Sequence, residues 1–375
     1  MKAICNAKIV LEEGILENAT LVYNEKIKLI GTDVSVEGCE VLDAGGKYLF
    51  PGLIDVHIHG YCGREVLEGT QEATRHMAKS LVRDGVTGFL ATLGTAPMQC
   101  VAESLDAVRN CMGNTEGAKL HGAYMEGVFI SEEKKGAHDA SLILPPDLAF
   151  VEKYLDVIRI MITPPEKYPD FIIWCVERGI LCAMGHTNAS YVEAMEGICC
   201  GASQATHLFN GMKGIHHRDP GTAGAALLAD GVNVELIADT VHVAKELYKL
   251  IYRMKGADRI ILITDSCMAS GMGPGTYICN NRVVHVDNFI GRLENGTISG
   301  SVVPLRRDVL NFHRYAGVPL YETARMASLN PARILRLDHA LGSLRVGKCA
   351  DMFLADGELN VAYTIVDGSC VYRRQ

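Results

Sequence analysis

Two histidines stand at the end of an apolar run near the start of the chain. The run 51–56, Pro-Gly-Leu-Ile-Asp-Val, leads directly into His57-Ile58-His59-Gly60. Side chains alternate faces along a strand, so the spacing of His57 and His59 sends both imidazoles to the same side. Neutral imidazoles are common metal ligands, and the pair is a candidate metal site. Such a pair alone is more often a surface or packing feature, so the hypothesis needs further ligands.

Polar residues follow later apolar runs in the same way. Glu126 closes one run, His186, His207 and His242 follow three others, and Asp265 ends a fifth. A carboxylate with two imidazoles, Glu126, His186 and His207, is the ligand set of a catalytic zinc or iron site with one position open for water. Asp265 is then the natural general base for that water, whose pKa a metal can lower to about 7. Each residue alone is more often structural, but five in equivalent positions favour an active site.

The elements that would position these residues alternate between strands and helices. Helical periodicity is expected over Gln71–Asp84, Met98–Cys111, Glu166–Arg178 and Ala189–Cys199. Strand-like runs separate such helices at 53–58, 87–93, 119–126, 157–162, 180–185, 203–208, 233–239 and 259–265. Eight repeats predict an α/β fold with a (β/α)8 TIM-like barrel in preference to an open doubly wound sheet, and the polar residues stand at the carboxyl ends of its strands.

Segments outside these repeats have the sequence pattern of β structure. Residues 1–50 contain short β-like runs, and the C-terminal stretch contains three more with an Asp367-Gly368 hairpin signal. Neither end has enough strands to bury a face, so we expect 1–50 plus 341–375 to form one small β-sandwich domain beside a metal-dependent barrel domain at 51–340. A Gly- and Asn-rich β segment at 271–297, before an expected last helix at Val303–Tyr315, could form a lid.

Composition excludes several classes of partner. The chain has 375 residues, 48% of them hydrophobic, and a net charge of −8, which indicates a globular protein without a basic stripe for nucleic acid. An anionic ligand would need a local basic pocket. Without a run of 18 apolar residues or a signal-like N-terminus we expect a cytoplasmic protein that does not bind membranes. The 13 cysteines contain no Cys-x-x-Cys, which argues against a disulfide framework or a zinc knuckle.

These motifs together resemble the amidohydrolase superfamily, and within it the N-acetylglucosamine-6-phosphate deacetylase family. The resemblance covers nearly the whole chain and is carried by segments 51–60, 124–127, 185–189, 206–212, 237–242 and 262–265, of which Thr206-His207-Leu208-Phe209-Asn210-Gly211-Met212 is the most specific. It implies metal-dependent hydrolysis of the acetamide of N-acetylglucosamine 6-phosphate to glucosamine 6-phosphate and acetate.

The resemblance also implies roles for individual residues. Glu126, His186 and His207 would bind the metal, Asp265 would be proton donor and acceptor, and His242 would contact the substrate near the acetyl group. Further substrate contacts are implied for Ala137, His138, Asn210, Gly211, Ile298, Ser299 and Gly300. Arg218 is similar to a family arginine that reaches the phosphate from the neighbouring subunit, which implies a homodimer. A guanidinium suits a phosphate, although an isolated arginine more often makes a surface salt bridge.

Several alternatives stay open at the level of sequence. Because His57 and His59 are both present, one or two ions of zinc or iron per subunit are possible. Tyr124 stands where the family commonly has His, and Val128 replaces the usual Pro, which leaves the substrate open. N-acetylgalactosamine 6-phosphate or another N-acetyl sugar could be the substrate. A cyclic amidase is a rival, but its bridging lysine has no counterpart in 157–163. A non-catalytic binding protein is the least favoured reading, because all ligand candidates are present.

Overall fold

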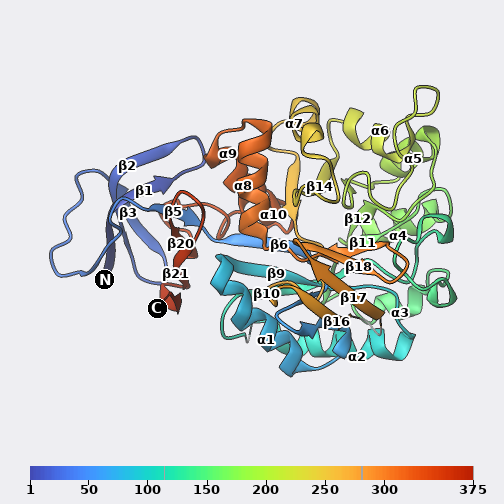
Figure 1. The fold of residues 1–375 in the computed structure, drawn as a ribbon, viewed down its shortest axis with the longest axis horizontal. Coiled ribbons are helices and arrows are strands. Elements are labelled where there is room, and N and C mark those ends of the chain that lie inside the picture. Colours follow the sequence, from blue (N-terminus) through green and yellow to red (C-terminus); the bar gives the residue numbers. More distant parts are fainter. Residues whose placement is uncertain (114, 280–281, 375) are drawn as a thin grey trace.

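The protein consists of a helix-covered β-barrel and a smaller β unit made from both chain ends, as the blue and red elements of Figure 1 show. The structure is a computed structural model that describes residues 1–113, 115–279 and 282–374. None of the helices in these ranges has the length and apolar character needed to cross a bilayer.

Eight parallel strands form the barrel. They are β6 (Leu53–Ile58), β9 (Val86–Leu93), β10 (Lys119–Met125), β11 (Ile158–Ile162), β12 (Leu181–Met184), β13 (Gln204–Ala205), β14 (Asn233–Ile237) and β15 (Ile260–Ile263). The circle closes between β15 and β6, where the Asp265 N–H donates to the His57 carbonyl at 2.8 Å and Ile58 bridges Ser266. Most of these strands are buried on both faces, which explains their nearly continuous apolar sequences. The predicted barrel is confirmed.

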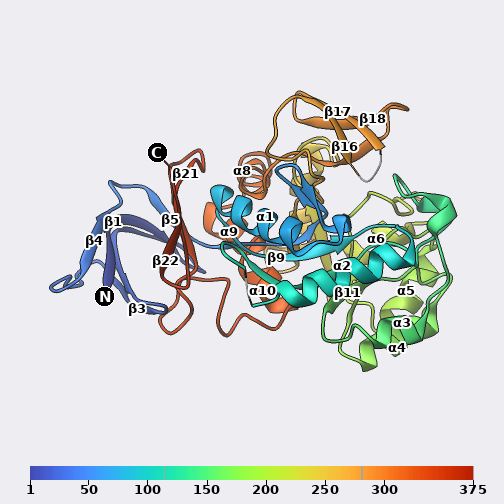
Figure 2. The same ribbon diagram turned by 90° about the horizontal axis from the view of Figure 1, so that it is seen from below.

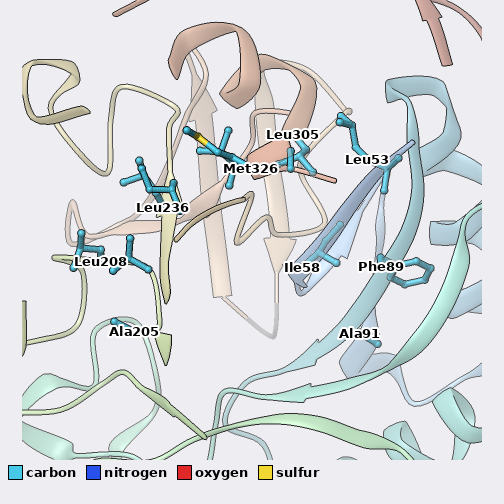
Figure 3. Packing of buried hydrophobic residues seen from close by; sticks show 14 of the residues in the cluster. Leu53, Ile58, Phe89, Ala91, Ala205, Leu208, Leu236, Leu305 and Met326 are labelled. Atoms are coloured by element: carbon cyan, nitrogen blue, oxygen red, sulfur yellow. The ribbon is translucent and has the colours of Figure 1, made fainter. Parts of the chain in front are cut away.

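Helices surround the barrel. They are α1 (Gln71–Leu81), α2 (Met98–Cys111), α3 (Leu148–Glu152), α4 (Pro169–Glu177), α5 (Tyr191–Cys199), α6 (Gly221–Leu228), α7 (Tyr248–Lys255) and α8 (Leu305–Ala316). Their apolar faces pack on the outside of the strands; Figure 3 labels Leu305 of α8 and Met326 in the same buried cluster as Leu53 and Ile58 of β6. Side-chain caps start α1 and α5: Thr70 accepts from the Ala73 N–H, and Ser190 forms a capping box with Glu193.

The expectation that Val303–Tyr315 is the last helix was wrong. That segment is α8, but α9 (Leu320–Met326) and α10 (Leu329–Ile334) follow it. Both are short, and Pro331 lies in the first turn of α10, where its missing N–H costs no helical hydrogen bond. Helices this short show too few periodic positions to be predicted from the sequence, and a proline inside one argues further against a helix.

The small β unit joins residues from the two ends of the chain. It contains β1 (Lys2–Val10), β2 (Ile15–Tyr23), β3 (Ile27–Gly31), β4 (Glu40–Asp43), β5 (Tyr48–Pro51), β20 (Met352–Ala355), β21 (Val361–Val366) and β22 (Ser369–Arg373). The sheet branches at β1, whose first half pairs with β4 and whose second half pairs with β5, and β5 in turn pairs with β20. Asp367 and Gly368 form the expected turn, with φ of 46° and 71°. The exact domain limits at residues 50 and 341 stay a prediction.

A β insertion between β15 and α8 covers the barrel mouth. The lid sheet, as we call it, comprises β16 (Gly275–Cys279), β17 (Arg282–Asp287), β18 (Ile290–Leu293) and β19 (Ile298–Ser301), which pair in order as an antiparallel sheet. Figure 2 shows it on one side of the barrel, away from the unit built by the termini. A short hairpin of β7 (Gly60–Tyr61) and β8 (Arg64–Glu65) follows β6 at the same mouth. The β excursion expected at 271–297 corresponds to the lid sheet.

Candidate active site

Three predicted metal ligands meet at the carboxyl ends of barrel strands. The Glu126 Oε1 atom lies 3.1 Å from Nε2 of His186 and 3.1 Å from Nε2 of His207, and the two nitrogens are 3.1 Å apart. All three side chains are buried. Residues from three different strand ends therefore converge closely enough to share one ion.

The backbone sets the orientation of the two imidazoles. Nδ1 of His186 donates to the Lys134 carbonyl at 2.8 Å, and Nδ1 of His207 donates to the Asn210 carbonyl at 3.1 Å. Donation from Nδ1 leaves the lone pair on Nε2, which is the atom that faces Glu126. Both histidines have positive φ, 43° and 28°, a strained conformation that the surrounding contacts hold and that is typical of functional sites.

A second cluster shares the same glutamate. Nε2 of His59 lies 2.8 Å from Glu126 Oε2 and 3.1 Å from Asp265 Oδ1, and Nε2 of His57 lies 3.4 Å from Asp265 Oδ1. The buried Nε2 of His57 has no hydrogen-bond partner within the described ranges. An unpaired nitrogen that faces two carboxylates fits a divalent cation, so the residues present suit a metal at this position also.

Electrostatics keep the carboxylates of both clusters ionised. Burial alone would raise the pKa of Glu126, but the charges of His59 and His138 outweigh it and hold that pKa well below its usual range. Burial likewise opposes ionisation of Asp265, and the charge of His57 with the hydrogen bond from His59 lowers its pKa. Burial would lower the pKa of His59, but Glu126 and Asp265 raise it to about 10. The carboxylates of this cluster are thus held ionised by the imidazoles beside them, and a divalent cation can take the place of the protons on those imidazoles.

A pocket of about 320 Å³ opens above these clusters. Its lining includes the predicted metal and catalytic residues His59, Glu126, His186, His207, His242 and Asp265. The predicted substrate contacts Ala137, His138, Asn210, Gly211, Ile298, Ser299 and Gly300 also line it. His57 lies beneath, with a fully buried side chain. The lid sheet supplies one wall, so the pocket lies between the strand ends and the lid.

Arg218 lies apart from the other predicted site residues. It is exposed, does not line the pocket of its own subunit, and has Nη1 2.7 Å from Nε2 of its neighbour His217. Its predicted contact with a phosphate would therefore need another subunit, and that contact stays a prediction.

Several residues of the site were missed in the sequence. Glu235, in β14, hydrogen-bonds His57, and Asp239 lies 2.7 Å from His242. A glutamate inside the apolar run 234–237 was the available signal, because a charged side chain is rarely buried in a strand without a partner. Arg282 and Cys279 of the lid sheet line the pocket without any such signal.

Tyr124, one of the two residues that depart from the family pattern, lies outside the pocket lining. Its ring is fully buried beside His57, with centroids 4.6 Å apart, and its hydroxyl is 2.7 Å from Thr206 Oγ1. The tyrosine thus supports the first-strand histidine from inside the barrel.

A closed parallel barrel with imidazoles and carboxylates gathered at its carboxyl-terminal mouth defines a metal-dependent hydrolase of the barrel class. The sequence agrees with this class: residues 48–371 match the amidohydrolase family. The chain belongs to that family, and within it to the family of the N-acetylglucosamine-6-phosphate deacetylases.

Relatives and solved structures give the basis for the narrower family. The chain is 33% identical to N-acetylglucosamine-6-phosphate deacetylase of Lysinibacillus sphaericus, over 92% of this chain and 90% of the relative. It is 30% identical to N-acetylgalactosamine-6-phosphate deacetylase of Escherichia coli O157:H7, over 96% and 97%. The crystal structure of the N-acetylglucosamine-6-phosphate deacetylase from Pasteurella multocida superposes with a TM-score of 0.94, at 30% identity over all of both chains.

Proposed function

We propose that this protein hydrolyses the acetamide of N-acetylglucosamine 6-phosphate to glucosamine 6-phosphate and acetate. The observation that supports this proposal most directly is that Glu126, His186 and His207 lie close together beside Asp265 in one pocket. Its volume of about 320 Å³ is in the range of small-molecule sites. Relatives that bear this activity in their names match over nearly their whole length.

The metal would be held in one or two positions. Glu126, His186 and His207 would hold one ion of zinc or iron, and His57 and His59 with Glu126 and Asp265 would hold a second. When bound, the metal supplies Lewis-acid chemistry toward the amide carbonyl and the attacking water.

The chain's own residues would move the protons. Asp265 takes a proton from the attacking water and later delivers it to the departing amine, so no covalent intermediate is needed. His242, whose Nδ1 is engaged by Asp239 and whose pKa that carboxylate raises, would be protonated and donate from Nε2 to the oxyanion of the tetrahedral intermediate.

The sugar phosphate would be held by the loops around the pocket. Ala137, His138, Asn210 and Gly211 line it from the barrel side, and Ile298, Ser299 and Gly300 line it from the lid side. We further propose a cytoplasmic homodimer in which Arg218 reaches the phosphate in the neighbouring subunit. Arginine suits this role because its fork of N–H groups matches phosphate oxygens.

The experiment that tests the activity is acetate release in parallel assays. The substrates are N-acetylglucosamine 6-phosphate, its galacto epimer and both unphosphorylated sugars, each with zinc and with ferrous iron. Asp265→Asn should abolish turnover while the ion held by Glu126, His186 and His207 stays bound, and Asp230→Asn, at an exposed position outside the pocket, should behave as the wild type. Wild-type turnover by Asp265→Asn would place the base elsewhere. No acetate from either 6-phosphate would refute the function.

The galacto epimer is a second candidate substrate. A relative named for it, from Escherichia coli O157:H7, is 30% identical over 96% of this chain. A higher kcat/KM for the galacto substrate in the same assay would assign the protein to that activity, because the two substrates differ only at C4.

A further inference from the structure

We infer that Glu235 is a positioning residue that holds His57 in place for a second metal ion. The residue is absent from the predicted ligand sets, yet its Oε2 lies 3.0 Å from Nδ1 of that histidine. The inference rests on the metal-dependent function proposed above and deepens it, because it names what makes the second position available.

The burial of Glu235 needs an explanation. Its side chain has no exposed surface, and it lies on β14 between Val234 and Leu236, which are also buried. Removing a carboxylate from water costs several kcal/mol unless it is paired and hydrogen-bonded. A glutamate at this position is therefore tolerated only because of the partners that it finds inside the barrel.

Those partners all belong to the metal-binding region. Glu235 Oε2 accepts from Nδ1 of His57 at 3.0 Å and from the backbone N–H of His207 at 3.3 Å. Its other oxygen accepts from the side-chain amide of Gln204 on β13. One carboxylate thus ties the first-strand histidine to the strand end that carries a ligand of the other cluster.

The hydrogen bond to Glu235 decides which nitrogen of His57 is free. In the neutral imidazole, a proton on Nδ1 leaves the lone pair on Nε2, the buried atom that has no hydrogen-bond partner within the described ranges. That atom lies 3.5 Å from Glu126 Oε1 and 3.4 Å from Asp265 Oδ1. The neutral imidazole is therefore held in the tautomer and orientation that a metal ligand requires.

The arrangement differs from that of the two histidines that would hold the first ion. His186 and His207 donate from Nδ1 to main-chain carbonyls, which almost any sequence provides. His57 donates to a side chain, so a single substitution can remove its acceptor. We therefore expect the second ion, and not the first, to depend on residue 235.

The test measures metal binding and not turnover. Zinc content and affinity are determined by equilibrium dialysis and elemental analysis for the wild type, Glu235→Gln and Glu235→Met. We expect two ions in the wild type and a second-ion affinity 10- to 100-fold weaker in Glu235→Gln, with a larger loss in Glu235→Met and an unchanged first ion in both. Glu246→Gln, at an exposed position, is the matched control.

A double-mutant cycle separates positioning from a general structural effect. In a His57→Ala background, Glu235→Gln should have no further effect on the ions that bind, because its action passes through that ring. Unchanged second-ion affinity in Glu235→Gln, equal weakening of both ions, or a further loss in the His57→Ala background would overturn the inference. A wild-type protein that saturates with one ion would also overturn it, while acetate release could still support the proposed deacetylase.

Discussion

The Oδ2 atom of Asp239 lies 2.7 Å from Nδ1 of His242, and the two side chains are only 1% and 9% exposed. The other oxygen, Oδ1, accepts the backbone N–H groups of Val241 and His242 at 2.8 and 2.9 Å. This carboxylate therefore fixes both the loop after β14 and the imidazole that the loop carries into the pocket. Burial would lower the pKa of His242, but the hydrogen bond and charge of Asp239 raise it.

Replacement of Asp239 by Asn should lower kcat about 10- to 100-fold, because the imidazole loses the partner that orients it. The pKa of His242 should fall as well, so the alkaline limb of the kcat profile should move to lower pH, where the ring now loses its proton. Steady-state rates of acetate release across pH measure both effects. A variant with reduced kcat but an unshifted profile would mean that Asp239 only stabilises the loop.

Arg218→Gln should raise KM for the 6-phosphate and leave the KM for the unphosphorylated sugar unchanged, if the guanidinium contacts phosphate from the neighbouring subunit. Mixing Arg218→Gln subunits with Asp265→Asn subunits should then restore activity, because each mixed dimer contains one site with both residues intact. The measurement is acetate release before and after subunit exchange. Activity that never exceeds that of the Arg218→Gln protein alone would contradict a contact between subunits.

Arg282, on β17 of the lid sheet, provides a cation within the same subunit. It lines both the active-site pocket and an adjoining opening of about 380 Å³ that Lys135 also lines. A charge-assisted hydrogen bond contributes about 1.5–3 kcal/mol, so Arg282→Gln should raise KM for the phosphorylated substrate roughly 10- to 100-fold. Arg292→Gln on the adjacent strand, at an exposed position, is the control. Equal effects on phosphorylated and unphosphorylated sugars would exclude phosphate recognition by Arg282.

His121, on β10, should make the protein less stable in acid. Burial, together with the charges of Lys119 and Arg159, lowers its pKa to about 4, and its Nε2 has no hydrogen-bond partner in the described part of the chain. Between about pH 6.5 and 4 the unfolded chain binds a proton that the folded protein does not, so the free energy of unfolding falls as pH falls, by roughly 2–3 kcal/mol in total.

His121→Gln removes this titration and should flatten the change in the thermal midpoint between neutral pH and pH 4. His76→Gln, at an exposed position, should keep the wild-type dependence. The prediction fails if the two variants lose stability in parallel on acidification.

Much of the site could be predicted because its signals are local. The period of two in His57-Ile58-His59 places both rings on one face, and the barrel pattern puts Glu126, His186, His207 and Asp265 at strand ends that meet at one mouth. Residues 298–300 and 137–138, in contrast, were assigned from the family resemblance, and their place in the pocket lining depends on how the lid sheet and the loop after β10 fold over the mouth.

Residue order along the chain was thus enough to specify the barrel and the β structure of both ends and to predict the metal ligands, since strand and helix periods and strand-end positions are properties of short segments. Only the tertiary structure shows that Nε2 is the free nitrogen of His57. It also shows that Asp239 hydrogen-bonds His242 and that Arg282 lines the pocket. Glu235 and His57 are 178 residues apart, and no local pattern reports a contact that exists only once the barrel has closed.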